Sequence, residues 1–398
     1  MKKLMCLLLV LVMVCGMLTA CGGSSDEAKA SEPAASAEAD APKADKPAEV
    51  KLALVGPMTG DSAQYGLQFQ RGVDEAVAEY NAKGGTQVSV DYFDDKNDAK
   101  EAVSIGNKII ADGGYMAVIG PFSSTCALAM AEVLDEEKII TISPSCSHPD
   151  YVTLYDYTFR LSHVNSYEGK VAADYCKDEF GAKKVAAIYS NNDWGIAVDD
   201  AFVENVKANG MEMVANESFI VGQTKDFSAS LTKIMQSGAD SLYYMGQYTE
   251  CGLLLKQIKD LGLDIDVIVT TSSYKVETLQ LAGDAAEDVV FMTAFINDGT
   301  KPELNDFEEM VREKYDVAID NFIMRAYDAV RWLMDAFDRC ESTDPDTLRE
   351  AIIEVGKEGI DGINGYFVLG DDRNVEREFF FTRWNGKSGD EAAFEKID

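Results

Sequence analysis

Two clusters of hydroxyl side chains are the residues of this 398-residue chain that are best suited to chemistry. Each cluster follows an apolar run, AVIG at 117–120 or IITI at 139–142. The clusters consist of Ser123, Ser124 and Thr125, and of Ser143, Ser145 and Ser147. Hydroxyls at the start of a helix, together with its free N–H groups and positive dipole end, bind anions. The expected chemistry is therefore the binding of a small anionic group such as a carboxylate.

Catalytic chemistry has little support in the sequence. The chain has two histidines, His148 and His163, and no G-x-S-x-G elbow, phosphate-binding glycine loop or HExxH motif. It also has no clustered histidine and cysteine set with metal-ligand spacing. Acidic doublets such as Asp94-Asp95 are typical of helix caps and solvated turns. We expect a binding protein rather than an enzyme, with no metal and no cofactor.

Both clusters lie at one edge of a sheet if their strands are parallel, and parallel strands are joined by helices, so strands and helices should alternate along the chain. Apolar strand patterns at 50–56, 88–93, 116–119 and 139–143 are separated by helical patterns, and the alternation restarts after residue 159. Long helices are expected at 303–315, 322–340 and 346–355, and hairpin-like segments at 365–369 and 378–384. This order predicts two doubly wound α/β lobes. Ligands of such sheets lie at the carboxyl ends of the strands, where both clusters fall.

The charge of the chain excludes one class of partner. Its 69 acidic and 36 basic residues give a net charge of −33, which argues against nucleic-acid binding. We interpret the acidity as the solvated surface of a secreted protein.

The N-terminus predicts export. Two lysines precede an apolar run at 4–17, too short to span a bilayer, and LTAC follows at 18–21. This stretch resembles the lipobox of bacterial lipoproteins, which implies that residues 1–20 are removed and that Cys21 carries a lipid. An ordinary signal peptide with a coincidental cysteine is the alternative. Residues 22–49 lack large apolar side chains, so 21–49 is expected to be the lipidated cysteine and a disordered tether.

The remaining cysteines indicate neither a metal site nor a disulfide framework, because their number is odd and no CxxC spacing occurs. They are Cys126, Cys146, Cys176, Cys251 and Cys340. Cys126 and Cys146 fall in the two hydroxyl-rich turns, and whether they pair is left open.

From about residue 51 onward the chain resembles the periplasmic-binding-protein type I solute receptors of ABC importers, and among them the leucine/isoleucine/valine-binding proteins. The segments that carry the resemblance are VGPMTGDSAQYG (55–66), NAKGG (81–85), DDKNDAKEAV (94–103), AVIGPFSSTCALA (117–129), ISPSCSHP (142–149), NSYEGKVAADY (165–175), DFSASLTKI (226–234) and AGDAAEDVVF (282–291). The resemblance implies two lobes joined by three crossovers. Lobe one would comprise 50–163 plus 295–375, and lobe two 164–294 plus 376–398.

The resemblance also implies a ligand site in the cleft between the lobes. Ser124 and Ser147 would hold the ligand carboxylate through their hydroxyl and N–H groups, and the Ser145 carbonyl would accept from an amine. Tyr65 would lie over the ligand from lobe one. Charge-assisted hydrogen bonds of this kind contribute about 1.5–3 kcal/mol each.

Across the cleft the sequence departs from the pattern of that family. Trp194 occupies the position of a tyrosine in the family, and Gln247 and Tyr248 occupy the position of another aromatic residue. The alternative role of each aromatic side chain is plain core packing. The family positions that carry acidic residues hold Thr271 and Asn165 here.

Burying an ammonium group without a counter-charge is costly. Either Glu250 or Asp298 therefore replaces the missing carboxylate, or the ligand has no α-amino group.

These inferences predict a lipid-anchored receptor on the extracytoplasmic face of the cell membrane. It would act as a monomer, capture an amino acid or related small carboxylate, and deliver it to an ABC permease. The alternatives are a non-amino acid ligand, aromatic or short and organic, and a ligand sensor that reports to a membrane receptor.

Overall fold

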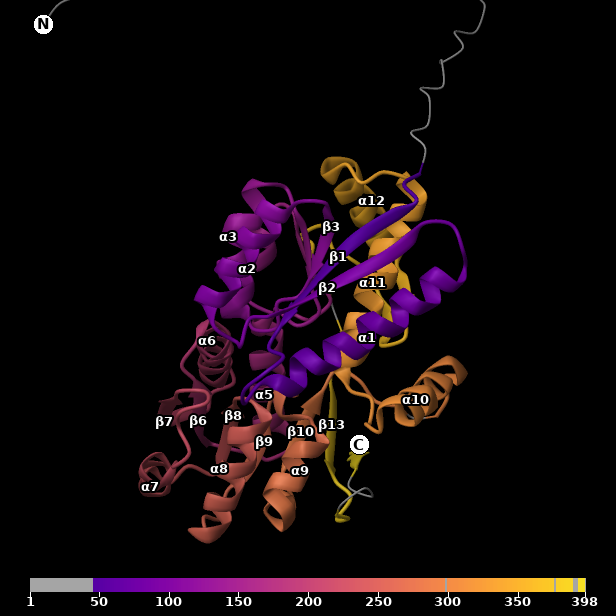
Figure 1. Ribbon diagram of the computed structural model, residues 1–398. Helices are drawn as coiled ribbons and strands as arrows, with labels where there is room; N and C mark the ends of the chain where they lie inside the picture. Colours follow the sequence, from indigo (N-terminus) through magenta and orange to yellow (C-terminus); the bar gives the residue numbers. More distant parts are fainter. Residues whose placement is uncertain (1–45, 298, 376, 389–392, 398) are drawn as a thin grey trace, which may run out of the picture. The chain divides into compact units, whose positions relative to one another are not determined.

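The computed structural model describes residues 46–297, 299–375, 377–388 and 393–397 (Figure 1). The expected signal peptide, Cys21 and nearly all of the tether lie outside these residues. The tether ends sooner than predicted, because the first strand begins at Glu49 and the Pro47 carbonyl accepts a hydrogen bond from Thr86 at 2.6 Å. In the part of the chain that the structure describes, no helix combines the length and apolarity needed to cross a bilayer.

The first lobe contains a five-stranded parallel sheet in the order β2-β1-β3-β4-β5. Its strands are β1 (Glu49–Gly56), β2 (Gln87–Asp94), β3 (Tyr115–Ile119), β4 (Ile140–Ser143) and β5 (Thr158–Arg160). Its helices are α1 (Ala63–Ala82), α2 (Ala99–Asp112), α3 (Ser124–Glu136), α4 (Asp150–Thr153), α10 (Pro302–Tyr315), α11 (Asn321–Cys340) and α12 (Pro345–Glu358).

Both faces of this sheet are covered, because successive side chains of a strand point to opposite faces. On β1, Leu52 and Leu54 pack into the core with α1 and α11, while Ala53 and Val55 pack into the core with α2 and α3. Figure 1 shows α1 beside α11 and α2 beside α3, in agreement with their contacts. The apolar strands read from the sequence are therefore buried on two sides.

The second lobe contains a seven-stranded sheet in the order β14-β13-β10-β9-β8-β6-β7. Its strands are β6 (Lys184–Ser190), β7 (Glu212–Phe219), β8 (Ser241–Met245), β9 (Asp266–Val269), β10 (Val290–Thr293), β13 (Phe380–Trp384) and β14 (Phe394–Lys396). Its helices are α5 (Asn165–Asp178), α6 (Asp193–Ala208), α7 (Ser228–Ser237), α8 (Tyr248–Asp260) and α9 (Val276–Ala282), with 3₁₀ turns at Thr271–Ser273 and Gly283–Ala286.

The chain passes between the sheets after β5, after β10 and before β13, and residue 298 of the second crossover and residue 376 of the third lie outside the described residues. The predicted fold class, two doubly wound α/β lobes, is confirmed. Both C-terminal segments form antiparallel pairs with a neighbouring strand, in agreement with the hairpin-like segments expected there. Residues 365–367 (β12) pair with β11 (Ile360–Gly362), and β13 pairs with β14 and also adds antiparallel to β10.

Candidate functional site

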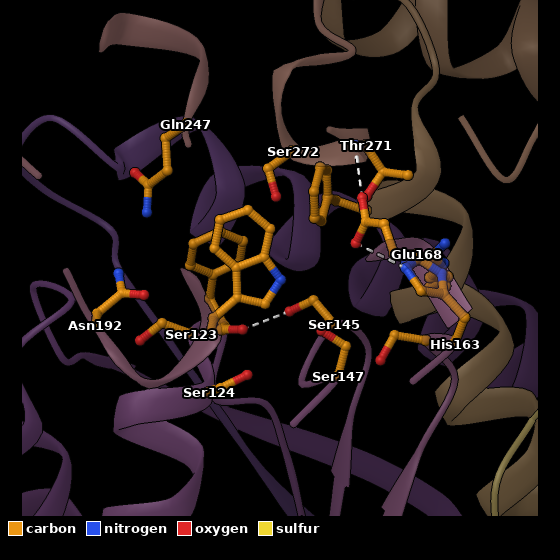
Figure 2. A pocket seen from close by; sticks show the side chains of 15 residues that line it. Ser123, Ser124, Ser145, Ser147, His163, Glu168, Asn192, Gln247, Thr271 and Ser272 are labelled. Atoms are coloured by element: carbon orange, nitrogen blue, oxygen red, sulfur yellow. Dashed lines mark hydrogen bonds and ion pairs between the residues drawn. The ribbon is translucent and has the colours of Figure 1, made fainter. Parts of the chain in front are cut away.

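The candidate site is a cavity between the carboxyl ends of the two sheets, lined by the 15 residues drawn in Figure 2. The space between atoms at this site, part of which is open solvent, amounts to about 510 Å³. Lobe one contributes the turns after β3 and β4 and the start of α11. Lobe two contributes the starts of α5, α6 and α8 and the turn after β9.

The first hydroxyl-rich turn is held by its own helix. Ser123 is the N-cap of α3, and its side chain accepts from the Cys126 N–H at 3.3 Å. Ser124 is the first residue of α3 and is buried at the cavity wall. The Cys146 thiol donates to the Ser124 hydroxyl oxygen at 3.6 Å, and burial raises the pKa of that thiol, so it stays protonated. The Ser124 hydrogen is left available to a ligand.

In the second hydroxyl-rich turn, one serine stabilises the turn and two line the cavity. Ser143 donates to the Pro121 carbonyl at 2.7 Å and accepts from the Cys146 N–H at 2.8 Å, which fixes the turn. Ser145 and Ser147 line the cavity, and Ser145 donates its hydroxyl to the Phe122 carbonyl at 2.6 Å. Ser123 and Ser124 of the first cluster therefore meet Ser145 and Ser147 of the second at one wall, as Figure 2 shows. Thr125 and Ser143, the other members of the predicted clusters, do not line the cavity.

A buried carboxylate that the sequence analysis did not identify faces this wall. Glu168 lies in the first turn of α5 with 1% of its surface exposed. Its carboxylate accepts from the Thr271 N–H and from His163 Nε2, both at 3.0 Å (Figure 2). Burial alone raises the pKa of Glu168, but hydrogen bonds from His163 and Thr271 outweigh it, and the pKa is lowered. Burial lowers the pKa of His163. The pair is thus an ionised carboxylate beside a neutral imidazole.

Among the residues that the structure describes, Glu168 rather than Glu250 supplies the negative charge of the cavity. Glu250 does not line the cavity; its carboxylate accepts from the Gly222 N–H at 2.7 Å elsewhere in lobe two, so that expectation was wrong. Asp298 lies outside the described residues. The spacing from Asn165 to Glu168 is one helical turn and places both residues on one helix face, a signal that was available in the sequence.

Three residues at which the sequence departs from the family pattern, Trp194, Gln247 and Thr271, line the cavity. Trp194 is the second residue of α6, whose N-cap Asn192 accepts from the Gly195 N–H at 2.8 Å. A Cβ on Gly195 would stand 2.1 Å from the Ser190 carbonyl oxygen, so only glycine lets α6 begin so close to β6.

Asn165 does not line the cavity. Its side-chain amide donates to the Trp194 carbonyl at 3.2 Å and so holds Trp194 in position.

Tyr65 and Tyr248 also lie behind the cavity wall. The Tyr65 ring stacks on Phe122 at 4.1 Å between centroids, and Phe122 lines the cavity in its place. The Tyr65 hydroxyl donates to the Ser272 carbonyl at 2.8 Å and accepts from the Tyr248 N–H at 3.3 Å. Tyr248 donates to the Asp61 carbonyl at 3.1 Å. These tyrosines join the two lobes through hydrogen bonds, as does the 2.6 Å bond from Ser62 to Gln247.

An unexpected arginine completes the charged groups of the wall. Arg325 lies in the second turn of α11 with 3% of its surface exposed. Its Nε and Nη2 atoms are buried and have no hydrogen-bond partner within the described residues. Burial and the nearby Arg377 lower the pKa of Arg325 to about 9, so the group is charged at neutral pH.

The five cysteines of the described chain are free thiols, so Cys126 and Cys146 are not bonded to each other in this structure.

Comparison with known proteins gives consistent matches. A family model described as periplasmic binding protein matches residues 49–390. The chain is 32% identical over 316 residues to Leu/Ile/Val-binding protein homolog 1 of Brucella abortus (strain 2308), covering 78% of this chain and 83% of the relative. It is 31% identical to Leu/Ile/Val-binding protein BraC3 of Rhizobium johnstonii, covering 78% of this chain and 85% of that protein.

Solved structures share the fold. The branched-chain amino acid transporter substrate binding protein LivJ of Streptococcus pneumoniae, in complex with isoleucine, superposes with a TM-score of 0.79 at 25% identity, covering 88% of this chain and all of that one. An ABC transporter solute binding protein of R. palustris in complex with benzoate gives the same TM-score at 20% identity, covering 87% of this chain and 96% of that one, a likeness of fold alone.

Proposed function

The chain belongs to the periplasmic binding protein family, and from that premise we propose that it is the extracytoplasmic substrate-binding protein of an ABC transporter. It captures an amino acid between its two lobes and delivers it to a membrane permease. The relatives named for leucine, isoleucine and valine support the transport role. The observation that carries the choice of an amino acid is the ionised, buried Glu168 in the same cavity as the serine cluster.

A zwitterion satisfies both charged parts of this cavity. The ligand carboxylate lies at the N-terminus of α3, with hydrogen bonds from Ser124 and Ser147. Its ammonium group donates to Glu168 and to the Ser145 carbonyl. A buried carboxylate that faces a cavity is stabilised by a cation, so a ligand without an amino group leaves Glu168 without its strongest partner.

Binding couples to closure of the lobes. In our proposal lobe one comprises 50–163 plus 295–375, and lobe two 164–294 plus 376–398, which agrees with the division of the described strands into two sheets. The chain crosses between them three times, and short crossovers act as a hinge. The hydrogen bonds Ser62–Gln247 and Tyr65–Ser272 form only when the lobes are together.

A ligand panel tests the amino-acid assignment. Calorimetric titration of the protein with L-amino acids and with the matching 2-oxo acids and benzoates should give tight binding only to the amino acids. Equal binding of the 2-oxo acids or benzoates would contradict the proposal and support the non-amino acid alternative.

Uptake distinguishes transport from sensing. Deletion of the gene should abolish uptake of the radiolabelled ligand and leave other solutes unaffected. Normal uptake combined with a lost response to the ligand would support the sensor instead.

The anchor is proposed from the sequence alone, since residues 1–45 lie outside the described chain. Cys21 carries a lipid, and the residues after it tether the lobes to the membrane. Metabolic labelling with an alkyne fatty acid should mark the protein, and Cys21→Ala should abolish the label and release the protein from the membrane fraction. Membrane retention of the unlabelled variant would contradict the anchor.

We also propose that the protein is a monomer, because one chain supplies both walls of the cavity. Light scattering of the purified protein should give the mass of a single chain with and without ligand; a dimer mass would contradict this.

A further inference from the structure

One charged group of the cavity is not explained by a simple zwitterion. Arg325 lines the cavity, and its guanidinium donates to no group in the described part of the chain. The other arginines buried to this extent are held by backbone carbonyls. Arg160 donates to the His148 carbonyl at 2.9 Å, and Arg377 donates to the Leu161 carbonyl at 2.9 Å. Arg325 differs from both in having no such partner.

The carboxylates that influence Arg325 electrostatically are Glu168 and Asp320, and each already accepts hydrogen bonds from groups other than Arg325. The Glu168 oxygens accept from Thr271 and His163. Asp320 caps α11 through the N–H groups of its first turn and pairs with Lys275 at 2.5 Å. Neither forms an ion pair with Arg325 within 4 Å in the described chain. A buried guanidinium without an anionic partner is costly, so this position is suited to an anion that arrives with the ligand.

We propose that Arg325 binds a second carboxylate of the ligand, so that the protein is a receptor for an acidic amino acid. This inference rests on the proposed function, which assigns the first carboxylate to the serine cluster and the ammonium group to Glu168. The planar guanidinium fork suits a carboxylate in a bidentate arrangement. The cavity then offers one partner for each of the three charges of glutamate or aspartate.

An aliphatic ligand fits this wall poorly. A leucine side chain has no hydrogen-bond acceptor. It would displace solvent from the Arg325 guanidinium without forming a hydrogen bond in its place, which is costly. The inferred ligand class therefore differs from that of the relatives named for leucine, isoleucine and valine.

Affinities of the wild-type protein provide the first test, which needs no variant. Calorimetric titration of the purified full-length protein should show L-glutamate or L-aspartate binding at least 10-fold more tightly than L-leucine and L-glutamine. Leucine binding as tight as that of the acidic amino acids would overturn the inference and leave the proposed function standing.

The variants Arg325→Met and Arg331→Met form a matched pair on α11, because Arg331 does not line the cavity. Arg325→Met should weaken binding of the acidic amino acid at least 30-fold and change leucine binding less than 3-fold, whereas Arg331→Met should behave as wild type. An equal loss for both ligands would contradict a specific role for Arg325.

Glutarate separates this inference from the proposed function, because it has two carboxylates and no amino group. Tight glutarate binding that is lost in Arg325→Met would support the arginine site and contradict the amino-acid assignment. Weak glutarate binding beside tight glutamate binding would support both.

Discussion

The two walls of the cavity are built by different means. The serine part of the lobe-one wall, made by Ser124, Ser145 and Ser147, attracts an anion through hydroxyls and a helix N-terminus, that is, through dipoles. Arg325 adds a full positive charge to the same lobe but lies apart from these serines in the sequence, on α11. The lobe-two wall uses a full charge, the Glu168 carboxylate, which His163 and Thr271 hold in place.

In our proposal the serines recognise the carboxylate that all candidate ligands share, and Glu168 recognises the ammonium group that only amino acids have. A dipolar wall binds any carboxylate, and it is assembled from two short turns. A charged wall discriminates, because a buried charge without its complement is costly. Substitutions on the two walls should therefore differ in size and in which ligands they affect.

The largest effect is expected from Glu168→Gln. Loss of the buried charge should weaken amino-acid binding by roughly 3–5 kcal/mol, the cost of removing one partner from a buried ion pair. Calorimetry measures the change, and Glu250→Gln, which alters a buried carboxylate outside the cavity, is the control. If both variants lost equal affinity, the contrast between the walls would be wrong.

A smaller effect is expected from Ser124→Ala on the dipolar wall. It removes one hydrogen bond to a charged group, so amino acids and des-amino acids alike should bind about 1–3 kcal/mol more weakly. Ser104→Ala, at an exposed position of α2, serves as the control for thermal stability and affinity. Unchanged affinity in Ser124→Ala would place the carboxylate elsewhere.

Asn165→Ala should act indirectly. The variant frees the Trp194 carbonyl, so we expect a loss of about 0.5–1.5 kcal/mol of ligand affinity. The change in tryptophan fluorescence on ligand addition should also decrease. Asn107→Ala, which removes a comparable side-chain-to-backbone bond at an exposed position of α2, should change neither. Normal affinity with normal fluorescence would show that Trp194 needs no such support.

The smallest effect is expected from pH. The pKa of Glu168 is lowered from an ordinary value of 4.5, so its carboxylate, and with it the site for the ammonium group, stays charged from pH 5 to 8. Affinity for an amino acid should be nearly constant over that interval and decline only as the pH falls below about 4.5. Calorimetry at several pH values measures it; a steep decline between pH 7 and 5 would contradict the ionised carboxylate beside neutral histidine.

Local patterns were sufficient to predict the fold class and the hydroxyl-rich turns. Strand patterns of four to eight apolar residues that alternate with helical spacing define a doubly wound fold, because each sheet must be covered on both faces. Ser124 and Ser147 could be located because each lies in the short turn that follows a strand, β3 or β4, and such strand ends meet at one edge of the sheet. For these residues the chemistry depends on neighbours a few positions away.

Only the tertiary structure decided which charges face the ligand. Glu168 is one of 69 acidic residues, and its state depends on Thr271, which is 103 positions away. Arg325 occupies an ordinary position in the helical pattern of α11. Only the packing of α11 against the cavity shows that its guanidinium is buried without a hydrogen-bond partner in the described chain. Tyr65 was expected to lie over the ligand but stacks on Phe122 instead. Burial and pairing are set by contacts between distant segments, and these determine whether a charged side chain supports the fold or faces the ligand.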